Sequence, residues 1–397
     1  MKKLFILLVF VLVSCTEPYH LQTSNFEEAL VIEATITNEL KSQQIKITKT
    51  YRLEENGPDF VENAEVYVKD NLGNIYNFSE GDEIYQSDIA FQAVQGRSYQ
   101  LFINTADGKS YQSDAELLTH ENPIQSIEVA DKTFQGERGA EIKVKAFDPT
   151  NSSKYYRYEY EETYKIIAPK WLPFTVLVDP NTKELIYTPR TYEARTCYST
   201  VKSNDIILTK TTNLNEDRVD HMVRFIAVTD PIIKHRYSIL VRQYVQNLEA
   251  YTYYSTLKQL SNNESILSQN QPGFFSGNIE CVSNPNEKVI GFFDVSTVSS
   301  QRIFFNFPDV FPNTQYPGYF YDCYDCIDPD PSNCRDGKYK FCFHPSSDTC
   351  EGYLAENELN SGRMLFLSFD SPYIYLVPAP CGDCTKFSSN VVPPFWQ

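Results

Sequence analysis

Two pairs of cysteines near the C-terminus have the spacing of metal ligands. Cys323 and Cys326 are separated by two residues, and so are Cys381 and Cys384. A Cys-x-x-Cys pair can bind one metal ion through both thiolates, and two such pairs form the four-sulfur shell that zinc accepts. The same residues form disulfides in an oxidising compartment, so the location of the protein decides between the two chemistries.

The N-terminus indicates where the protein is located. Lys2 and Lys3 precede an apolar run, 4–13, that has the length of a secretory signal and is too short to span a bilayer permanently. The run is followed by Ser14 and Cys15, in the order aliphatic, permissive, small, cysteine. A signal peptidase cleaves before such a cysteine, and the thiol then carries a diacylglyceryl group.

We therefore predict a lipoprotein signal peptide over 1–14, lipid (palmitate and related acyl chains) on Cys15, and a polar tether over 15–27. An ordinary cleaved signal, in which Cys15 is incidental, is the alternative. Cleavage leaves 383 residues and removes two lysines, so the formal net charge changes from −17 to −19.

Export favours disulfides among the remaining cysteines, because oxidation competes with metal binding outside the cytoplasm. We predict up to four bridges and one remaining thiol, no cofactor, and zinc at Cys323, Cys326, Cys381 and Cys384 only as a minor alternative. The disulfide candidates are Cys197, Cys281, Cys323, Cys326, Cys334, Cys342, Cys350, Cys381 and Cys384.

The segment around the first Cys-x-x-Cys pair is rich in acids and aromatics. Its carboxylates could hold Ca²⁺, although Asn333 stands where an EF-hand loop needs glycine, and a solvated acidic loop is the favoured interpretation. Its rings could form a platform for a peptide or glycan, or equally the core of a small disulfide-bonded loop. The acids are Asp322, Asp325, Asp328, Asp330 and Asp336, and the aromatics are Tyr319, Phe320, Tyr321 and Tyr324.

Catalytic motifs are scarce. The five histidines show no His-Glu-x-x-His or paired spacing, and the sequence has no Gly-x-Ser-x-Gly or phosphate-binding loop. We therefore predict a protein that is not an enzyme. A hydrolase triad assembled from distant positions is the alternative that a sequence alone leaves open.

Composition restricts the fold and the partners. An acidic chain of net charge −17 is a poor nucleic-acid binder, and no stretch after the signal approaches eighteen apolar residues. The chain contains 28 Tyr and 26 Phe, residues that suit half-buried strand positions. These features indicate an all-β protein.

Short apolar runs separated by turn signals begin at residue 29. About seven of them precede residue 119, with turns at Asp70-Asn71-Leu72-Gly73 and at Asp107-Gly108. This spacing predicts an immunoglobulin-like β-sandwich over 28–119 that holds together without a disulfide.

A second β-rich domain is predicted over 120–309, with one helix at about 245–260 where apolar residues recur every three positions. Four prolines between 167 and 195 predict an irregular excursion. The region 310–397 is predicted to be a loop-like, Cys-rich segment packed on the second domain.

Several stretches resemble one family in their order and spacing. They are the junction Ser14-Cys15, DGKSYQS (107–113), YYRYEYEETYKI (155–166), PGFFSGNIECVSNPNEKVIGFFDVSTV (272–298), CGDCTKF (381–387) and PPFW (393–396). Together they resemble the Bacteroidota lipoproteins grouped as domain of unknown function 4249. This chain departs from that pattern at 387–390, where the family usually carries a glycine-rich stretch, and in an insert at 327–350.

The resemblance implies a location and a partner. Members of the family are typically encoded beside TonB-dependent outer-membrane transporters, which implies a lipid-anchored protein at the outer membrane, on the cell-surface side. We therefore expect an accessory protein that caps such a β-barrel or binds its cargo. A structural subunit of an outer-membrane assembly or secretion complex and an extracellular hydrolase are the alternatives.

Overall fold

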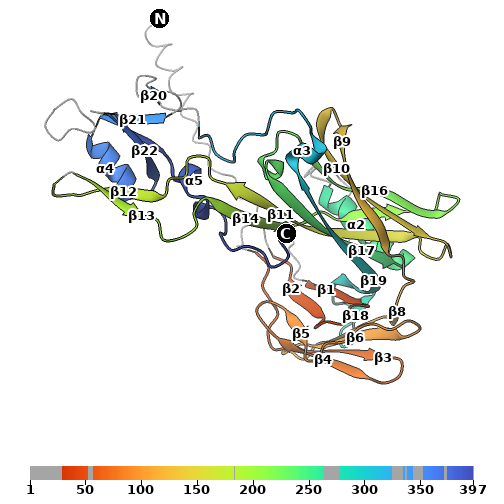
Figure 1. The fold of residues 1–397 in the computed structure, drawn as a ribbon. Helices are drawn as coiled ribbons and strands as arrows, with labels where there is room; N and C mark the ends of the chain where they lie inside the picture. Colours follow the sequence, from red (N-terminus) through yellow and green to blue (C-terminus); the bar gives the residue numbers. More distant parts are fainter. Residues whose placement is uncertain are drawn as a thin grey trace, which may run out of the picture.

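The computed structural model describes residues 29–51, 57–182, 184–262, 277–323, 334–335, 338–342, 352–370 and 373–396. Strands dominate these residues and helices are few, as Figure 1 shows, so the predicted all-β fold is confirmed. Three parts can be followed in Figure 1: an N-terminal sandwich, a central body and a distal lobe. No helix in the described residues is long and apolar enough to cross a membrane.

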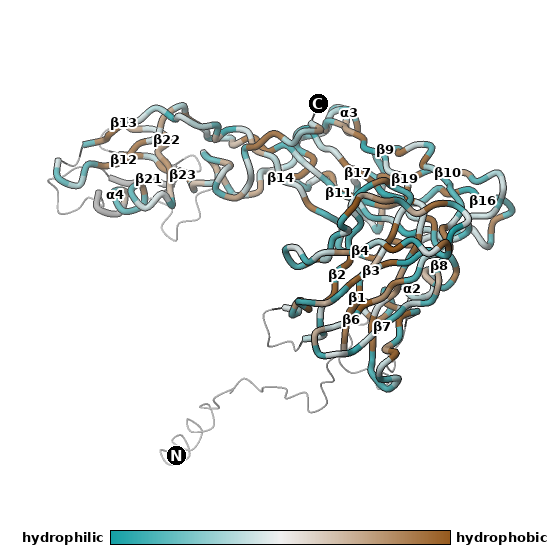
Figure 2. Tube along the Cα trace, turned by 90° about the horizontal axis from the view of Figure 1, so that it is seen from below, coloured by the Kyte–Doolittle hydropathy of each residue, from teal (hydrophilic) through white to brown (hydrophobic). Residues whose placement is uncertain are grey.

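The N-terminal sandwich forms because its strands alternate buried and exposed side chains. In β1, Leu30, Ile32, Ala34 and Ile36 are all buried, and they share one core with residues from both layers. Figure 2 shows the hydrophobic residues concentrated along these strands. The strands are β1 (Leu30–Thr37), β2 (Gln44–Lys49), β3 (Glu65–Asp70), β4 (Ile75–Glu80), β5 (Tyr85–Ser87), β6 (Ser98–Asn104), β7 (Ser110–Ser113), β8 (Glu116–Leu117) and β18 (Ile279–Cys281).

One long strand joins the sandwich to the central body. β19 (Val289–Asn306) pairs in parallel with β1 over its first half and antiparallel with β17 (Arg236–Gln246) over its second half. The two parts therefore share a continuous hydrogen-bonded sheet, which passes from β17 through β19 to β1. A rigid connection follows, because rotating one part against the other would break this ladder.

The central body consists of two facing sheets. One contains β14, β11, β17 and β19, with β15 paired to β11, and the other has the order β16-β10-β9. The core between them contains Tyr156, Tyr158 and Tyr237, all fully buried. The remaining strand bounds are β9 (Ile124–Phe134), β10 (Glu137–Asp148), β11 (Tyr155–Ile167), β14 (Thr196–Lys202), β15 (Ile207–Lys210) and β16 (Asp217–Ala227). Two short helices accompany this body, η1 (Pro231–Ile233) and α3 (Phe307–Val310).

The predicted helix is α2 (Leu248–Asn262), which begins three residues later than predicted. β17 continues to Gln246, and the Asn247 side chain then accepts a hydrogen bond from the backbone N–H of Ala250 at 2.7 Å. Such a side-chain acceptor begins a helix by satisfying an otherwise unpaired donor. The apolar spacing alone did not show where the strand ends.

The structure of the distal lobe differs from two predictions, the irregular excursion at 167–195 and the loop-like region 310–397. The excursion at 167–195 contains a hairpin, β12 (Phe174–Val178) and β13 (Leu185–Pro189), and the region after 310 contains a four-stranded sheet and a helix. The prolines had hidden the hairpin, but Pro173 and Pro180 lie just outside β12 and Pro189 ends β13, so none of them interrupts it. The other elements are β20 (Cys334–Arg335), β21 (Lys338–Cys342), α4 (Gly352–Asn360), β22 (Met364–Asp370) and β23 (Tyr373–Pro378).

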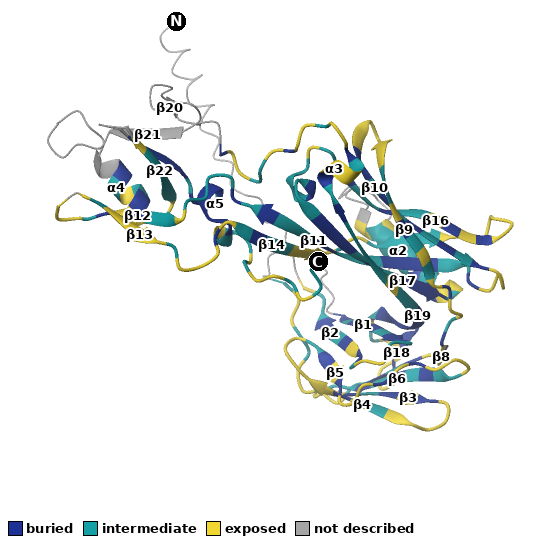
Figure 3. Cartoon of the chain, in the orientation of Figure 1, coloured by how far each residue is buried: buried dark blue, intermediate teal, exposed yellow. Residues whose placement is uncertain are grey.

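The lobe projects away from the central body, as Figures 1 and 3 show. Its small core joins Val178 of the hairpin with Leu359 of α4 and Leu376 of β23. The chain returns from it through α5 (Ala379–Gly382) and η3 (Cys384–Lys386) to the edge of the central sheet. Figure 3 also shows that the tips of the long hairpins are exposed.

The expected boundaries 28–119, 120–309 and 310–397 differ from this packing. β18 and half of β19 complete the N-terminal sandwich, while the 174–189 hairpin joins the lobe formed by the C-terminal region. Strand pairing between distant segments produces both exchanges, and sequence order alone contains no signal for it.

Candidate functional site

A recess of about 400 Å³ lies at the junction of the N-terminal sandwich and the central body. β1 and β19 contribute one wall, α2 a second, β11 a third, and the connection between β14 and β15 part of the rim. We call this recess the junction pocket. Its lining includes Glu33, Arg157, Glu159, Asp205, Tyr253, Tyr254 and Phe292.

Arg157 is the central charged residue of the junction pocket. It lies on β11 directly opposite Tyr244 of β17, so the two side chains project from the same face of the sheet. The guanidinium carbon lies 4.3 Å from the centre of the Tyr244 ring and 4.8 Å from that of Tyr254 on α2. The arginine is only 8 % exposed, and the two rings stabilise its charge where water is scarce.

Two carboxylates accompany this arginine. One guanidinium N–H donates to Glu159, two residues further along the same face of β11. Nη2 lies 3.9 Å from Oδ2 of Asp294 on β19, and Asp294 is 2 % exposed. Asp294 also accepts hydrogen bonds from Ser296 Oγ at 2.5 Å and Gln246 Nε2 at 3.2 Å.

The pKa values of the Asp294 and Glu159 carboxylates are shifted in opposite directions by their surroundings. Burial raises the pKa of Asp294, because the nearby Arg157 only partly offsets the loss of water. Burial also acts on Glu159, but Arg157 and the Tyr244 hydroxyl, which donates at 3.0 Å, outweigh it and lower the pKa of Glu159 below its usual value. Arg157 and Glu159 line the pocket and Asp294 does not, so the ion pair that faces the pocket is Arg157–Glu159.

The rim of the junction pocket is acidic and its wall is aromatic. Glu33 and Asp205 are exposed at the mouth. Tyr253 and Phe292 are buried, with ring centres 5.5 Å apart, and form an apolar wall beneath them. Such a combination of an apolar wall and a few convergent polar groups is typical of a ligand-binding cleft.

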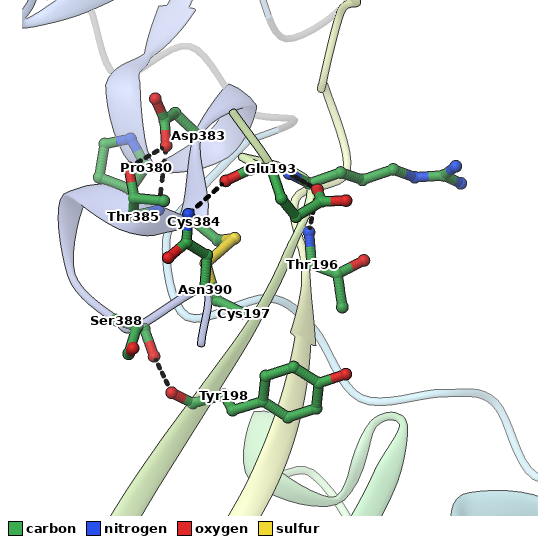
Figure 4. Close-up of a disulfide and its surroundings, with 12 residues drawn as sticks. Glu193, Thr196, Cys197, Tyr198, Pro380, Asp383, Cys384, Thr385, Ser388 and Asn390 are labelled. Atoms are coloured by element: carbon green, nitrogen blue, oxygen red, sulfur yellow. Dashed lines mark hydrogen bonds between the residues drawn. A yellow bond between two sulfur atoms is a disulfide. The ribbon is translucent and has the colours of Figure 1, made fainter. Parts of the chain in front are cut away.

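The C-terminal cysteines are placed at a different location. Figure 4 shows the disulfide between Cys197 on β14 and Cys384, and a second disulfide joins Cys323 to Cys381. The two cysteines of the last Cys-x-x-Cys motif thus bind two distant segments to one turn. Because those sulfurs are in disulfides, the structure favours bridges over zinc at Cys323, Cys381 and Cys384, and Cys326 lies outside the described residues.

Hydrogen bonds around the first disulfide continue the attachment of the C-terminal segment to β14. The backbone N–H of Tyr198 donates to the Ser389 carbonyl at 2.7 Å, and Ser388 Oγ donates to the Tyr198 carbonyl at 2.8 Å. Asn390 Nδ2 donates to the Glu193 carbonyl at 2.8 Å, as Figure 4 shows. The segment after Cys384 therefore covers the edge of the central sheet.

The other predicted cysteine positions have different outcomes. Cys281, one of the nine disulfide candidates, is buried as a free thiol on β18, and a single remaining thiol had been predicted among them. It occupies an inward position of the sandwich, where a small apolar side chain packs. Cys326 and Cys350, and the side chains of Cys334 and Cys342, lie outside the described residues.

The rings of the predicted aromatic cluster pack beside the two disulfides. Tyr319, Phe320 and Tyr321 surround Phe387, with ring centres 5.0 to 6.2 Å from it. The Tyr319 hydroxyl donates to the Pro380 carbonyl at 3.0 Å. Of the two predicted roles, the packed loop core is the one that these contacts favour, and Tyr324 lies outside the described residues.

Of the five aspartates predicted as alternative calcium ligands, the structure describes one. Asp322 is exposed, and Asp325, Asp328, Asp330 and Asp336 lie outside the described residues. Within the described part of the chain, no group of three or more Cys, His, Asp or Glu side chains is arranged to hold a metal ion.

The junction pocket contains residues that the sequence did not single out. The alternation of Arg157, Glu159 and Glu161 with tyrosines in one strand was the available signal, since it marks a charged face. Nothing in the sequence placed Asp294 or Tyr254 opposite that face. Their approach depends on β17 and β19 lying next to β11.

Similarity to solved structures is weak. The chain is similar to "Biofilm associated protein - BSP domain" at 8 % identity over 70 % of this chain and 60 % of that one, with a TM-score of 0.13. The related "Biofilm associated protein - B domain" matches at 9 % identity over 68 % of this chain and 85 % of that one, with a TM-score of 0.12. TM-scores this low carry no inference about fold or function.

No curated protein matches the chain. A family model described as "Domain of unknown function (DUF4249)" matches residues 16–302, well over half of the sequence. The chain belongs to this family.

Proposed function

We propose that this protein is a non-enzymatic accessory lipoprotein of a TonB-dependent outer-membrane transporter, which it serves by capping the channel or by binding its cargo. The observation that supports this most directly is the position of the junction pocket on β1, the first strand after the predicted tether. β1 is paired on both edges, to β2 and to β19. A pulling force from the tether on the start of β1 is therefore resisted by the hydrogen bonds to both neighbouring strands.

The tether sets how far that pocket lies from the membrane. Fourteen peptide steps separate Cys15 from Ala29, and a fully extended chain of that length reaches at most roughly 50 Å. A lipid on Cys15 would thus keep the pocket close to a channel in the same membrane. This arrangement suits a protein that holds cargo for a neighbouring β-barrel.

Two of the three described histidines, His221 and His235, do not favour the hydrolase alternative. Burial lowers the pKa of both His221 and His235 to about 4, and the His221 ring stacks on Tyr158 with centres 5.5 Å apart. Among the described residues, no serine or cysteine donates a hydrogen bond to either ring. A histidine base in a hydrolase needs such a contact with its nucleophile.

Affinity purification from solubilised outer membranes tests the proposal. The full chain is expected to retain a TonB-dependent β-barrel, whereas a Cys15→Ser variant, which lacks the lipid, should lose membrane association and most of the barrel. Recovery without any β-barrel partner would contradict the proposal.

Deletion of the gene separates the proposed role from the structural one. Loss of uptake of one nutrient supports the accessory role, and a general envelope defect supports an assembly subunit. Labelling by an active-site-directed serine or cysteine hydrolase probe would support the enzymatic alternative instead.

A further inference from the structure

The junction pocket has the size of a site for a small organic ligand. Its volume of about 400 Å³ lies in the lower half of the range for ligand clefts, which is enough for one or two amino-acid residues. The recess forms where the sandwich, α2 and the central body meet, a position at which binding sites are common. Since the sandwich and body share β19, its walls are held in a fixed relation.

The charges around the pocket favour a cation. Among the described residues, three carboxylates line it, those of Glu33, Glu159 and Asp205, and one guanidinium, that of Arg157. That guanidinium already contacts Glu159 and lies 3.9 Å from Asp294, so little of its charge remains for an anionic ligand. An incoming anion would meet the exposed rim carboxylates before it reached the arginine.

The walls are suited to the same kind of ligand. Tyr253 and Phe292 provide an apolar surface, and tyrosine faces attract cations through their ring quadrupole. Arg157, held over Tyr244 and Tyr254, shows that this environment accepts a positive charge.

One buried donor adds a second requirement. Nε of Arg157 has no hydrogen-bond acceptor among the described residues, and the arginine is more than nine-tenths buried. A buried donor without an acceptor is unfavourable, so a carbonyl oxygen for which the neighbouring side chains made room would be stabilised there. A ligand with an ammonium group near a carbonyl and an apolar side chain meets all of these features.

We propose that the junction pocket binds the amino terminus of a peptide whose first residue is large and apolar. The ammonium group lies among Glu33, Glu159 and Asp205, the side chain contacts Tyr253 and Phe292, and a carbonyl accepts from Arg157. The inference rests on the cargo-binding form of the proposed function and names its ligand class.

Three matched probes test the charge preference: phenylalanylglycinamide, its N-acetyl derivative, and N-acetylphenylalanylglycine as the free acid. They share the aromatic side chain and differ in charge, which is positive, zero and negative at about pH 6.5. Titration calorimetry with the detergent-solubilised full chain is expected to show the cationic probe binding at least about tenfold more tightly than the neutral one, with the anion weakest.

Variants assign the binding to this pocket. Glu33→Gln combined with Asp205→Asn should reduce the preference for the cationic over the neutral probe by about five- to tenfold and leave the neutral affinity unchanged. Asn204→Trp, a change at an exposed rim position, should obstruct the mouth and abolish binding of all three probes. Asp82→Asn with Glu83→Gln, two exposed acids on the turn after β4, is the matched control and should change nothing.

Equal affinity for the charged and neutral probes, tighter binding of the anion, or no saturable binding of any probe at about 10 mM would overturn the inference. The Glu33→Gln/Asp205→Asn variant should still co-purify with the β-barrel if the barrel is its partner. The two proposals therefore fail in different ways. The peptide site fails if the probes do not bind as expected, whereas the accessory role fails if the wild-type chain does not co-purify with the β-barrel.

Discussion

Arg157 on β11 and Asp294 on β19 lie with Nη2 and Oδ2 3.9 Å apart, although β17 separates their strands in the sheet. Both residues are buried, and the Tyr244 and Tyr254 rings cover the guanidinium. The pair thus connects the central body to the strand that also builds the sandwich. Its removal should affect stability as well as the pocket.

Replacing the arginine alone should be severely destabilising. Arg157→Met leaves the carboxylates of Glu159 and Asp294 without their cation and is expected to lower the free energy of unfolding by about 3–5 kcal/mol. The double variant Arg157→Met/Asp294→Asn should lose clearly less than the sum of the two single changes, because the charges are coupled.

Urea denaturation of the four proteins in this cycle measures the coupling. Arg218→Met removes an exposed arginine paired with Glu216 and should change stability by no more than about 0.5 kcal/mol. An Arg157→Met protein as stable as the wild type would show that the Arg157–Asp294 pair does not contribute to the free energy of unfolding.

Asn278 closes the sandwich through its side chain. Its Oδ1 accepts from the backbone N–H of Phe293 at 2.8 Å, and its Nδ2 donates to the Phe293 carbonyl at 3.0 Å, so the amide replaces one step of a ladder between β18 and β19. Asn278→Ala leaves both backbone groups buried and unpaired, and should destabilise the protein by about 2–4 kcal/mol in thermal or urea unfolding. Asn213→Ala, at an exposed turn position, is the control, and an equal effect of the two would contradict this role.

The two disulfides should be recovered in a defined pattern. Peptide mapping without reductant is expected to find Cys197 joined to Cys384 and Cys323 to Cys381, with Cys281 alkylated only after unfolding because it is buried. Cys197→Ser with Cys384→Ser should lower the free energy of unfolding by about 2–5 kcal/mol, since this bridge closes a long loop. A bridge within either Cys-x-x-Cys motif, or stoichiometric zinc in the purified protein, would contradict the pairing.

Two histidines should make the fold sensitive to mild acid. Burial lowers the pKa of His221 and His235 from 6.5 to about 4, so between these pH values the unfolded chain binds protons that the folded chain does not. Stability contributed by each neutral ring is therefore lost as pH falls from about 6.5 to 4, by on the order of 1–3 kcal/mol per histidine.

Urea midpoints measured at about pH 7 and pH 4.5 test this direction. His221→Gln should be less sensitive to that change than the wild type, and His120→Gln, at an exposed position, should behave as the wild type. A wild-type protein more stable at the lower pH, with His221→Gln unchanged, would oppose the assignment.

The sequence predicted individual strands, turns and the helix better than it predicted which distant segments lie side by side. Strand alternation in 30–36 and the turn residues before Tyr111 predicted the sandwich, because a half-buried strand needs that period. Three-residue recurrence of apolar side chains predicted α2, but the Asn247 cap set its start. Prolines hid the 174–189 hairpin, since in a single sequence a proline at a strand end looks like one within it.

The cysteines show the same division. Their number and the predicted export indicated disulfides, yet the spacing of Cys381 and Cys384 invited a local pair or a shared metal. The fold brings β14 to one of these cysteines and residue 323 to the other, so each forms a long-range bridge instead.

By itself, the sequence determined that this is an acidic, tyrosine-rich β-protein with a predicted lipid attachment at Cys15, since composition and short patterns follow from single strands and single segments. Only the tertiary structure decided that β18 and β19 complete the N-terminal sandwich and that Arg157 lies among Glu159, Asp294 and two tyrosines. These contacts depend on which strands lie side by side. That order is selected by the burial of whole faces, and no residue pattern within one strand specifies it.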